Sequence, residues 1–350
     1  MKKLFLLMAM ALPVCLFTAC GGDDDGDGDP GGVGGGNPGG GSTSTSSSVT
    51  EITGNDGSKV RLSSDFSCSY TYDEKGNLIA IVNKHSDTTY PVSYNPFKIT
   101  MEDGNQSETM TAEFNKKGYI SKLKDVSIVK DEYSQTSYED IAYFTYDNDS
   151  HLTKITGTRT KKETYQGQSY TSKSEYSESY TWNNGLLTKI VTEYSQSGGG
   201  ISMKDVETIT YTYEGGYRND CFQYTFAYNY SSYGIFQRLG FCGKGSSKLP
   251  SLAKTVSTYY QNGEKEEAEY VRNEAYTYTF NNNGTVKEET VSYPDTDYQD
   301  YYNLYRFTYT NEAANEAESA AKFHNSTFEK KASSLRPLFF TKRLNRNRQK

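Results

Sequence analysis

The chain has 350 residues and a formal net charge of −7, and this acidic balance gives no support to a general role in binding nucleic acid. Its 32 tyrosines and 16 phenylalanines, beside 1 tryptophan and 8 prolines, favour β-structure. Without a leader, a tether and a tail, the remaining length suits one large all-β domain or two small ones.

Residues 1–19 have the layout of a secretory signal peptide. Lys2 and Lys3 form a basic start, an apolar stretch follows as far as Phe17, and small residues stand directly before Cys20. The apolar stretch is too short to cross a bilayer as a mature helix. Because a cysteine at the cleavage point matches the lipobox of bacterial lipoproteins, we expect acyl chains on Cys20. The alternative is an ordinary signal peptide with an incidental cysteine.

Residues 20–50 are predicted to form a flexible tether. The acidic, glycine-rich run at 21–29 resembles the export signal that sends lipoproteins of Bacteroidota to the outer face of the outer membrane. Alternating Asp and Gly also suggest a calcium loop, but Pro30 and more glycines follow where an EF-hand needs a bidentate glutamate and a helix. The Gly/Ser/Thr-rich composition cannot offset its ordering entropy. We therefore expect a lipid-anchored protein of a Gram-negative outer membrane that faces the cell exterior.

Residues 51–310 repeat one phrase, in which an aromatic pattern such as Tyr-Thr-Tyr precedes a turn with Asp or Asn and Gly. Copies lie at residues 70–81, 112–120, 144–155, 180–190 and 278–286, and residues 211–216 keep the first half. A period of two places both aromatic side chains on one face of a strand. Asp or Asn opens the turn and Gly supplies the positive φ that ends it, so each copy is predicted to be a β-hairpin.

One spacing in these hairpins does not fit a regular strand. Leu78 and Ile81 are three residues apart, as are Leu152 and Ile155, so a regular strand would point the members of each pair to opposite faces. Two explanations stay open at this stage: a bulge beside the turn, or partial cover on both faces of the sheet.

The repeated hairpins predict an all-β fold, an antiparallel meander that forms a barrel-like or strongly curled sheet. A closed barrel of about a dozen or more strands is too wide for side chains alone to fill, so we expect it to enclose a cavity or to flatten. The tyrosines are predicted to form the core face, and the alternative is an exposed ladder that stacks on sugars or a partner. A membrane-spanning barrel is not favoured, because the apolar face with Ile201 and Met203 also carries Asp205 and Glu207.

The hairpin phrase is similar to the YD repeats of large secreted shell proteins, and the whole layout resembles domain-of-unknown-function family 4595. The lipobox, the acidic tether, the spaced Tyr-Thr-Tyr-Asp hairpins and the segment 240–251 carry this resemblance, which covers roughly residues 55–310. That family consists of Bacteroidota lipoproteins with a porin-like fold. The resemblance implies a shape and no activity, and only lipidation at Cys20 carries over.

No segment carries the signature of a catalytic or metal site. The histidines, His85, His151 and His324, are scattered without the spacing of metal ligands. The glycine-rich stretch 240–245 fits no nucleotide-binding motif and is predicted to belong to a long crossover loop. Carboxylates are abundant, yet none stands in a distinctive segment. We therefore expect a protein that is not an enzyme and that uses no metal and no cofactor.

Two covalent modifications are suggested by short patterns. An oxidising location allows a disulfide between Cys221 and Cys242 with Cys68 left over, although three cysteines at irregular spacing are also typical of small buried side chains. The triplet Asp87-Thr88-Thr89 resembles the O-glycosylation acceptor of Bacteroidota, which makes Thr88 the candidate residue.

Together these patterns favour a non-catalytic binding or interaction module whose ligand is a glycan or a protein. The alternative is a carrier that holds an apolar or amphiphilic small ligand in a β-barrel cavity, and a scaffold without a ligand is the third interpretation. Residues 311–350 turn from Glu/Ala-rich to basic composition. We expect a short helix at 311–321 and a disordered extension after it, with contact to an anionic membrane surface as the alternative.

Overall fold

The computed structural model describes residues 50–131, 134–165, 167–198, 201–228, 233–265, 269–294 and 302–310. The predicted signal peptide, Cys20, the tether up to residue 49 and the tail 311–350 lie outside the described residues. The strands are β1 (Ile52–Thr53), β2 (Lys59–Val60), β3 (Leu62–Ser64), β4 (Cys68–Tyr72), β5 (Leu78–Asn83), β6 (Thr89–Ser93), β7 (Phe97–Asp103), β8 (Gln106–Phe114), β9 (Ile120–Lys130), β10 (Ser134–Tyr146), β11 (Leu152–Tyr165), β12 (Gln168–Asn183), β13 (Leu186–Gly198), β14 (Ile201–Thr212), β15 (Leu252–Gln261), β16 (Glu264–Lys265), β17 (Tyr270–Phe280), β18 (Val286–Ser292), β19 (Tyr302–Arg306) and β20 (Thr308–Tyr309). The helices are the 3-10 helix η1 (Phe226–Tyr228) and the α-helix α2 (Gly234–Arg238).

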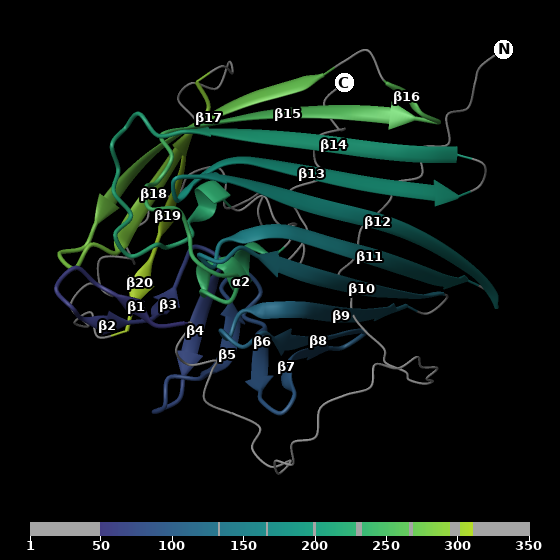
Figure 1. Cartoon of the computed structure of the whole chain (residues 1–350). Coiled ribbons are helices and arrows are strands. Elements are labelled where there is room, and N and C mark those ends of the chain that lie inside the picture. Colours follow the sequence, from purple (N-terminus) through teal and green to yellow (C-terminus); the bar gives the residue numbers. More distant parts are fainter. Residues whose placement is uncertain are drawn as a thin grey trace, which may run out of the picture.

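Strands β3 to β20 form a closed antiparallel barrel whose strands follow one another in chain order (Figure 1). The barrel closes where the last strands meet the first, because β19 pairs with β18 while β20 pairs with β3. Strands β1 and β2 form a separate two-stranded sheet. The predicted all-β meander of hairpins is therefore confirmed, and the sheet is a barrel.

The complete copies of the sequence phrase are hairpins, and each has a register shift beside its turn. In the first copy, Tyr70 pairs with Ile81 and Tyr72 pairs with Leu78, so Ile79 is an extra residue. This bulge turns Leu78 and Ile81 to the same face, where their exposed fractions are 0% and 1%. A bulge is thus the reason for the three-residue spacing of the apolar side chains.

The turn of the same hairpin is held by Asp73. Its Oδ1 atom accepts hydrogen bonds from the backbone N–H groups of Lys75 (2.9 Å) and Asn77 (2.8 Å). Gly76 ends the turn with a φ of 80°, a conformation that glycine adopts without steric cost. The Asp-x-x-Gly pattern therefore forms the predicted turn by the predicted chemistry.

The crossover between β14 and β15, of which residues 213–228 and 233–251 are described, enters the barrel and fills one end of it. We call this segment the plug; it includes η1 and α2, and Figure 1 shows α2 within the ring of strands. On one wall the Phe241 carbonyl accepts a hydrogen bond from the backbone N–H of Ile120 (2.9 Å). On another wall the ring of Phe226 stacks on that of Tyr305, with centroids 4.3 Å apart. The interior at this end is therefore packed with protein.

The glycine-rich part of the plug packs against the hairpin turns. The backbone N–H of Lys244 donates to the carbonyl of Ser150 (2.9 Å), and that of Ser247 donates to the carbonyl of Gly185 (3.1 Å). A Cβ atom on Gly243, whose φ is 85°, would lie 2.2 Å from the Ser150 carbonyl oxygen. The predicted crossover loop is confirmed, and its glycine permits this close approach of two backbones.

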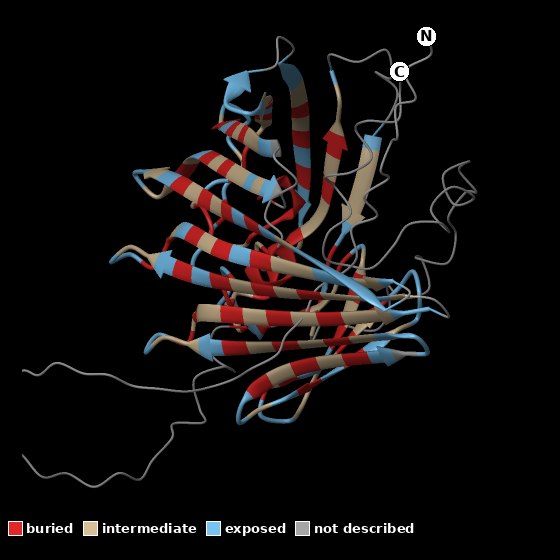
Figure 2. Cartoon of the chain, turned by 90° about the vertical axis from the view of Figure 1, so that its right-hand side faces the viewer, coloured by how far each residue is buried: buried red, intermediate tan, exposed pale blue. Residues whose placement is uncertain are grey.

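Burial alternates along the strands, as the banding in Figure 2 shows. The inward face carries aliphatic side chains and buried tyrosines, which confirms the core interpretation for Tyr70, Tyr90, Tyr180, Tyr211, Tyr276 and Tyr278. The outward face of β11 carries Lys154, Thr156, Thr158, Thr160 and Lys162. The outward face of β12 carries Thr171, Lys173, Glu175, Ser177, Ser179 and Thr181. Such a polar outer surface suits water and not lipid chains.

The sequence argument against a spanning barrel used a face that points inward. Glu207 is 8% exposed and Ile209 is 0% exposed, so this face of β14 belongs to the interior. The outward side chains of the same strand include Lys204 and Thr210, and these are the ones that bear on contact with lipid. Among the described residues, no helix is long and apolar enough to cross a membrane.

Candidate functional site

Inward-facing side chains become more exposed toward the end of the barrel opposite the plug. On β12, Ser174 is buried, Ser172 is half-buried and Tyr170 is 62% exposed. On β14, Glu207 is buried and Met203 is 41% exposed. Because these positions all face the interior, their graded exposure shows that the barrel is open at this end, which we call the mouth.

Tyrosines from neighbouring strands occupy inward-facing positions at the mouth. They are Tyr138, Tyr165, Tyr170, Tyr194, Tyr259 and Tyr270. Tyr165 and Tyr170 are 53% and 62% exposed, and Tyr138 is buried with the Lys161 ammonium 5.7 Å from its ring centroid. The mouth therefore offers flat apolar ring faces together with hydroxyl groups.

Below these tyrosines lies a layer of buried acidic side chains, which we call the carboxylate belt. Its members are Glu108, Asp125, Asp140, Glu178, Glu207, Glu274 and Glu289, all at most 8% exposed. Asp125 lies directly across from Asp140, and Asp140 lies directly across from Arg159. On other strands, Glu178 faces Thr192, which in turn faces Glu207. The belt thus runs from strand to strand around the interior.

Asp140 is a belt member whose two carboxylate oxygens both accept hydrogen bonds from buried side chains. Nη2 of Arg159 donates to its Oδ2 atom (2.6 Å), and the Tyr176 hydroxyl donates to its Oδ1 atom (2.5 Å). Tyr176 also shares a hydrogen bond with Tyr233 of the plug. The Tyr176 ring lies over Gly157, where a Cβ atom would come within 2.1 Å of the ring. Gly157 therefore makes the room that lets Tyr176 connect the belt to the plug.

Four other belt carboxylates accept hydrogen bonds from nearby donors. The donors and acceptors are Tyr180 Oη to Glu178 (2.7 Å), Ser257 Oγ to Glu207 (3.1 Å), Tyr276 Oη to Glu274 (2.6 Å) and the Phe226 backbone N–H to Glu289 (2.8 Å). Arg272 also pairs with Glu274 (3.1 Å). Each of these groups is buried and satisfied, as buried polar groups generally are.

Glu108 and Asp125 differ from the rest of the belt. Among the described residues, neither oxygen of Glu108 has a hydrogen-bond partner, and Oδ1 of Asp125 has none. Burial raises the pKa of Glu108 to about 8. Burial also raises the pKa of Asp125 well above its usual value, and the charges of Glu108 and Asp140 add to this shift. These two carboxylates are the members of the belt that still lack donors.

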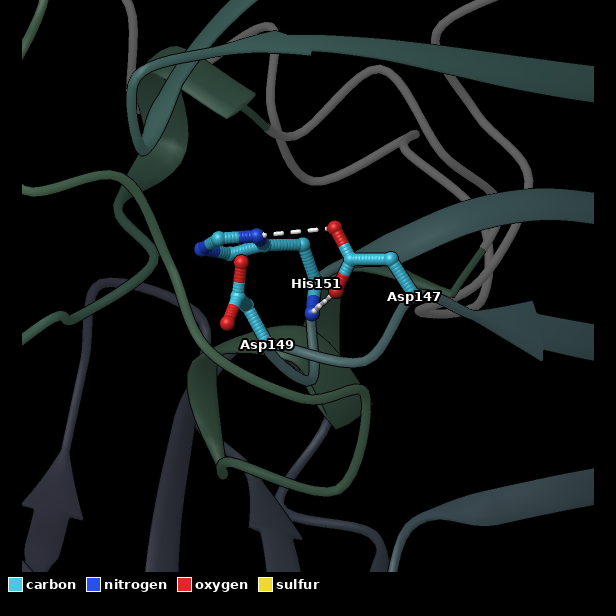
Figure 3. Close-up of side chains that lie close together, drawn as sticks. All are labelled: Asp147, Asp149 and His151. Atoms are coloured by element: carbon cyan, nitrogen blue, oxygen red, sulfur yellow. Dashed lines mark hydrogen bonds and ion pairs between the residues drawn. The ribbon is translucent and has the colours of Figure 1, made fainter.

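A second cluster lies in the turn between β10 and β11 and consists of Asp147, Asp149 and His151 (Figure 3). Their candidate ligand atoms lie within 4.8 Å of one another. The Asp147 carboxylate accepts a hydrogen bond from the His151 backbone N–H (2.8 Å) and lies 3.0 Å from its Nδ1 atom. Asp147 holds this turn as Asp73 holds the first one, so hairpin chemistry accounts for the contact.

The His151 ring has a packing role as well. It stacks on the ring of Trp182 with a centroid distance of 4.2 Å. The sequence interpretation placed His151 in a turn but did not bring it together with Asp147 and Asp149. The signal available in the sequence was that Asp147, Asp149 and His151 stand two residues apart within one tight turn. We assign this cluster to the hairpin.

The three cysteines of the described residues, Cys68, Cys221 and Cys242, are free thiols. Cys68 and Cys242 are both 0% exposed, and Cys221 is half-buried with its Sγ atom 4.0 Å from the carbonyl oxygen of Asn283. The expected bridge between Cys221 and Cys242 is therefore not formed by these described residues. The alternative interpretation, small buried side chains, describes Cys68 and Cys242.

The other predicted site residues are spread over the molecule. Thr88 is half-buried between β5 and β6, and its Oγ1 atom accepts a hydrogen bond from the Ser86 hydroxyl (2.8 Å). Its glycosylation stays a prediction. His324 and Cys20 lie outside the described residues. The sequence analysis did not identify the belt, although a signal existed. Glu178 stands two residues from Tyr176 and two from Tyr180, and so shares their inward face.

Comparison with known proteins gives matches among solved structures. The first is a porin-like protein from Bacteroides vulgatus, at 14% identity and a TM-score of 0.46, with 75% of this chain and 98% of that chain covered. The second is a porin-like protein from Bacteroides uniformis, at 15% identity and a TM-score of 0.38, with 74% and 93% covered. No family model matches, and no curated protein matches. The β-barrel assignment rests on the strand pairing of this chain itself.

Proposed function

We propose that this protein is a lipid-anchored, surface-exposed binding module that takes a glycan into the mouth of its barrel. The observation that carries the proposal is the arrangement of exposed tyrosine rings above a buried layer of carboxylates, at the open end of an otherwise filled barrel. Sugar rings present apolar C–H faces that stack on aromatic rings, and hydroxyl groups that hydrogen-bond to tyrosine hydroxyls. Few polar groups at fixed places in a concave site are typical of ligand recognition.

The alternative, a carrier of an apolar ligand, has less support. The plug fills the end of the interior that is lined by apolar side chains, with Phe236 and Phe241 at 1% and 0% exposure. The open end exposes tyrosines such as Tyr165 and Tyr170, and burying an apolar ligand against their hydroxyl groups would remove the hydration of these groups without replacing it. We propose binding without catalysis, and expect a bound oligosaccharide to be recovered intact.

Anchoring at Cys20 is part of the same proposal. Acyl chains on this residue would hold the barrel at the outer membrane through the tether, with the domain outside the cell. A polar ligand from the surroundings could then reach the mouth directly. The polar outer faces of β11 and β12 support attachment through the tether and not through the barrel wall.

A glycan array probed with the unlipidated Cys20→Ser chain tests the function. We expect binding to a defined class of oligosaccharides and loss of that binding in a Tyr165→Ala/Tyr170→Ala double variant. Tyr143→Ala is the matched control, because Tyr143 is 52% exposed but points outward from β10. Absence of binding to any glycan, or equal loss of binding in the Tyr143 control, would contradict the proposal.

A further inference from the structure

Three oxygen-bearing side chains on β8 and β9 lie together on the inner wall and lack partners. Glu108 lies directly across from Ser127, and Asp125 lies two residues from Ser127 on the same face of β9. Their exposed fractions are 2% for Glu108, 5% for Asp125 and 2% for Ser127. Both oxygens of Glu108, Oδ1 of Asp125 and the hydroxyl of Ser127 find no hydrogen-bond partner in the part of the chain that the structure describes. A buried polar atom without a partner often marks the place of an ion or water.

The groups that face these side chains supply too little positive charge. From β10, Asp140 lies opposite Asp125 and Tyr138 lies opposite Ser127. From β7, Met101 lies opposite Glu108. Arg159 on β11 is a nearby cationic side chain, and its Nη2 atom lies 2.6 Å from Oδ2 of Asp140. Arg159 is therefore engaged by Asp140, and only its charge reaches Asp125. Ionised carboxylates at Glu108 and Asp125 would need further positive charge, because burying a charge without compensation costs several kcal/mol for each ion.

We propose that Glu108, Asp125 and Ser127 form a binding site for a hard divalent cation, with Ca²⁺ as the occupant. All the open ligand atoms are oxygens, from two carboxylates and one hydroxyl, and Ca²⁺ takes six to eight oxygen ligands in a flexible arrangement. A dication matches the two carboxylate charges. Zn²⁺ fits less well, because its sites are built from nitrogen and sulfur ligands. This site is independent of glycan binding, and either proposal can fail alone.

Calcium titration of the unlipidated, chelator-treated Cys20→Ser chain tests the site. We expect a saturable increase in Tm, with a dissociation constant of about 10⁻⁴ to 10⁻³ M if the site has the affinity common in extracellular modules. Tb³⁺ as a calcium substitute should show luminescence excited through tyrosine. Tyr138→Phe should weaken that luminescence without changing the Tb³⁺ affinity, because Tyr138 is the cross-strand neighbour of Ser127.

Substitutions then identify which side chains bind the cation. Glu108→Gln and Asp125→Asn should each weaken Ca²⁺ binding about tenfold or more, by analogy with the loss of a supporting ligand. Two carboxylates serve as controls: Glu207→Gln alters a belt carboxylate that accepts a bond from Ser257, and Asp149→Asn alters the exposed turn cluster. Both controls should bind Ca²⁺ with unchanged affinity.

The outcomes separate the possibilities. Glu108→Gln keeps the shape of the side chain but cannot become a carboxylate, so we expect a folded variant that is insensitive to Ca²⁺. Ser127→Ala offers a second folded variant with weaker binding. The proposal is overturned if Ca²⁺ leaves Tm unchanged, if Glu108→Gln keeps the parent affinity, or if Asp149→Asn is the variant that loses binding.

Discussion

The seam where the barrel closes is short, and the plug supports it, so Arg238→Met should loosen the whole closure. The register between β20 and β3 contains Thr308 opposite Ser64 and Tyr309 opposite Leu62. Directly after β3, Asp65 accepts a hydrogen bond from Nε of Arg238 in the plug (2.9 Å). The guanidinium therefore ties the plug to the corner next to the seam.

The cost of this substitution can be worked out from the surroundings of the pair. The side chains of Arg238 and Asp65 are 5% and 0% exposed, and breaking a buried ion pair costs about 3–5 kcal/mol. Asp65 would keep three donors, the Tyr70 hydroxyl (2.7 Å) and the backbone N–H groups of Ser67 (2.8 Å) and Cys68 (2.9 Å), which favours the lower end of this range. The guanidinium also lies 4.2 Å from the ring centroid of Phe226, a contact worth about 1–2 kcal/mol when desolvated. We expect a total loss of about 4 kcal/mol in the free energy of unfolding.

Urea unfolding and amide hydrogen exchange measure this prediction. Exchange should rise first in β3, β4 and β20, while the long hairpins of β10 to β13 stay protected. Arg218→Met is the matched control in the same segment, because its pair with Asp220 is exposed (78% for the Arg218 side chain) and should contribute less than about 1 kcal/mol. A loss below about 1 kcal/mol for Arg238→Met, or exchange that rises equally in all strands, would refute the reasoning.

Four further predictions follow from the structure. Gly157→Val should destabilise the chain by about 1–3 kcal/mol or more in urea unfolding, because the Tyr176 ring occupies the space of the new side chain; an unchanged midpoint would contradict this packing. Burial raises the pKa of tyrosines such as Tyr211 well above 10, so the folded state binds more protons than the unfolded state above pH 10 and stability should fall as pH rises; tyrosinate absorbance should appear together with loss of near-UV circular dichroism, and ionisation with the fold intact would count against it. Burial also raises the pKa of the Cys242 thiol, so it should resist thiol reagents until urea unfolds the chain; rapid labelling of the native chain would show that it is accessible. Cys20→Ser should move the protein from the membrane fraction to the soluble fraction, and continued membrane retention would contradict anchoring by this residue.

The local parts of the fold could be predicted because their chemistry is local. The turn at Asp73 and Gly76 depends on a side-chain acceptor and a positive φ within a few residues, and both are visible in the sequence. The bulge at Ile79 was one of two explanations for the apolar spacing, because two buried side chains three residues apart require an inserted residue or a second covered face. The choice between them needed the register.

The filling of the barrel could not be predicted in the same way. The sequence argument expected an enclosed cavity or a flattened sheet, and did not consider a segment of backbone inside the ring. The plug makes its contacts over long sequence separations, such as 173 residues between Arg238 and Asp65 and 63 residues between Phe226 and Glu289. The sequence of the crossover does not indicate such distant partners, so the path of the plug through the interior could not be predicted.

The belt was missed for a related reason. A carboxylate at an inward position of a strand looks in the sequence like any acidic residue, and its partner can be a neighbour such as Tyr180 for Glu178 or a group on another strand such as Ser257 for Glu207. Only the register of the paired strands shows that these side chains share the inner face of the barrel. Asp125 and Asp140 become neighbours because β9 and β10 pair at these residues, and a slip of one residue would turn one of them outward.

The distribution of side chains on the barrel also explains why a lipid anchor would be needed. A barrel that crosses a membrane turns an apolar band outward, and a lysine at the bilayer midplane costs about 2–4 kcal/mol. Here the outward positions of β11 include Lys154 and Lys162, whereas Leu152 and Ile155 point inward with 0% exposure. The apolar side chains of β11 thus pack in the interior, and its outward side chains offer no apolar band for contact with lipid. The proposed acyl chains on Cys20 would therefore supply the membrane attachment that these walls cannot, and the barrel would be left free to present its mouth to a ligand.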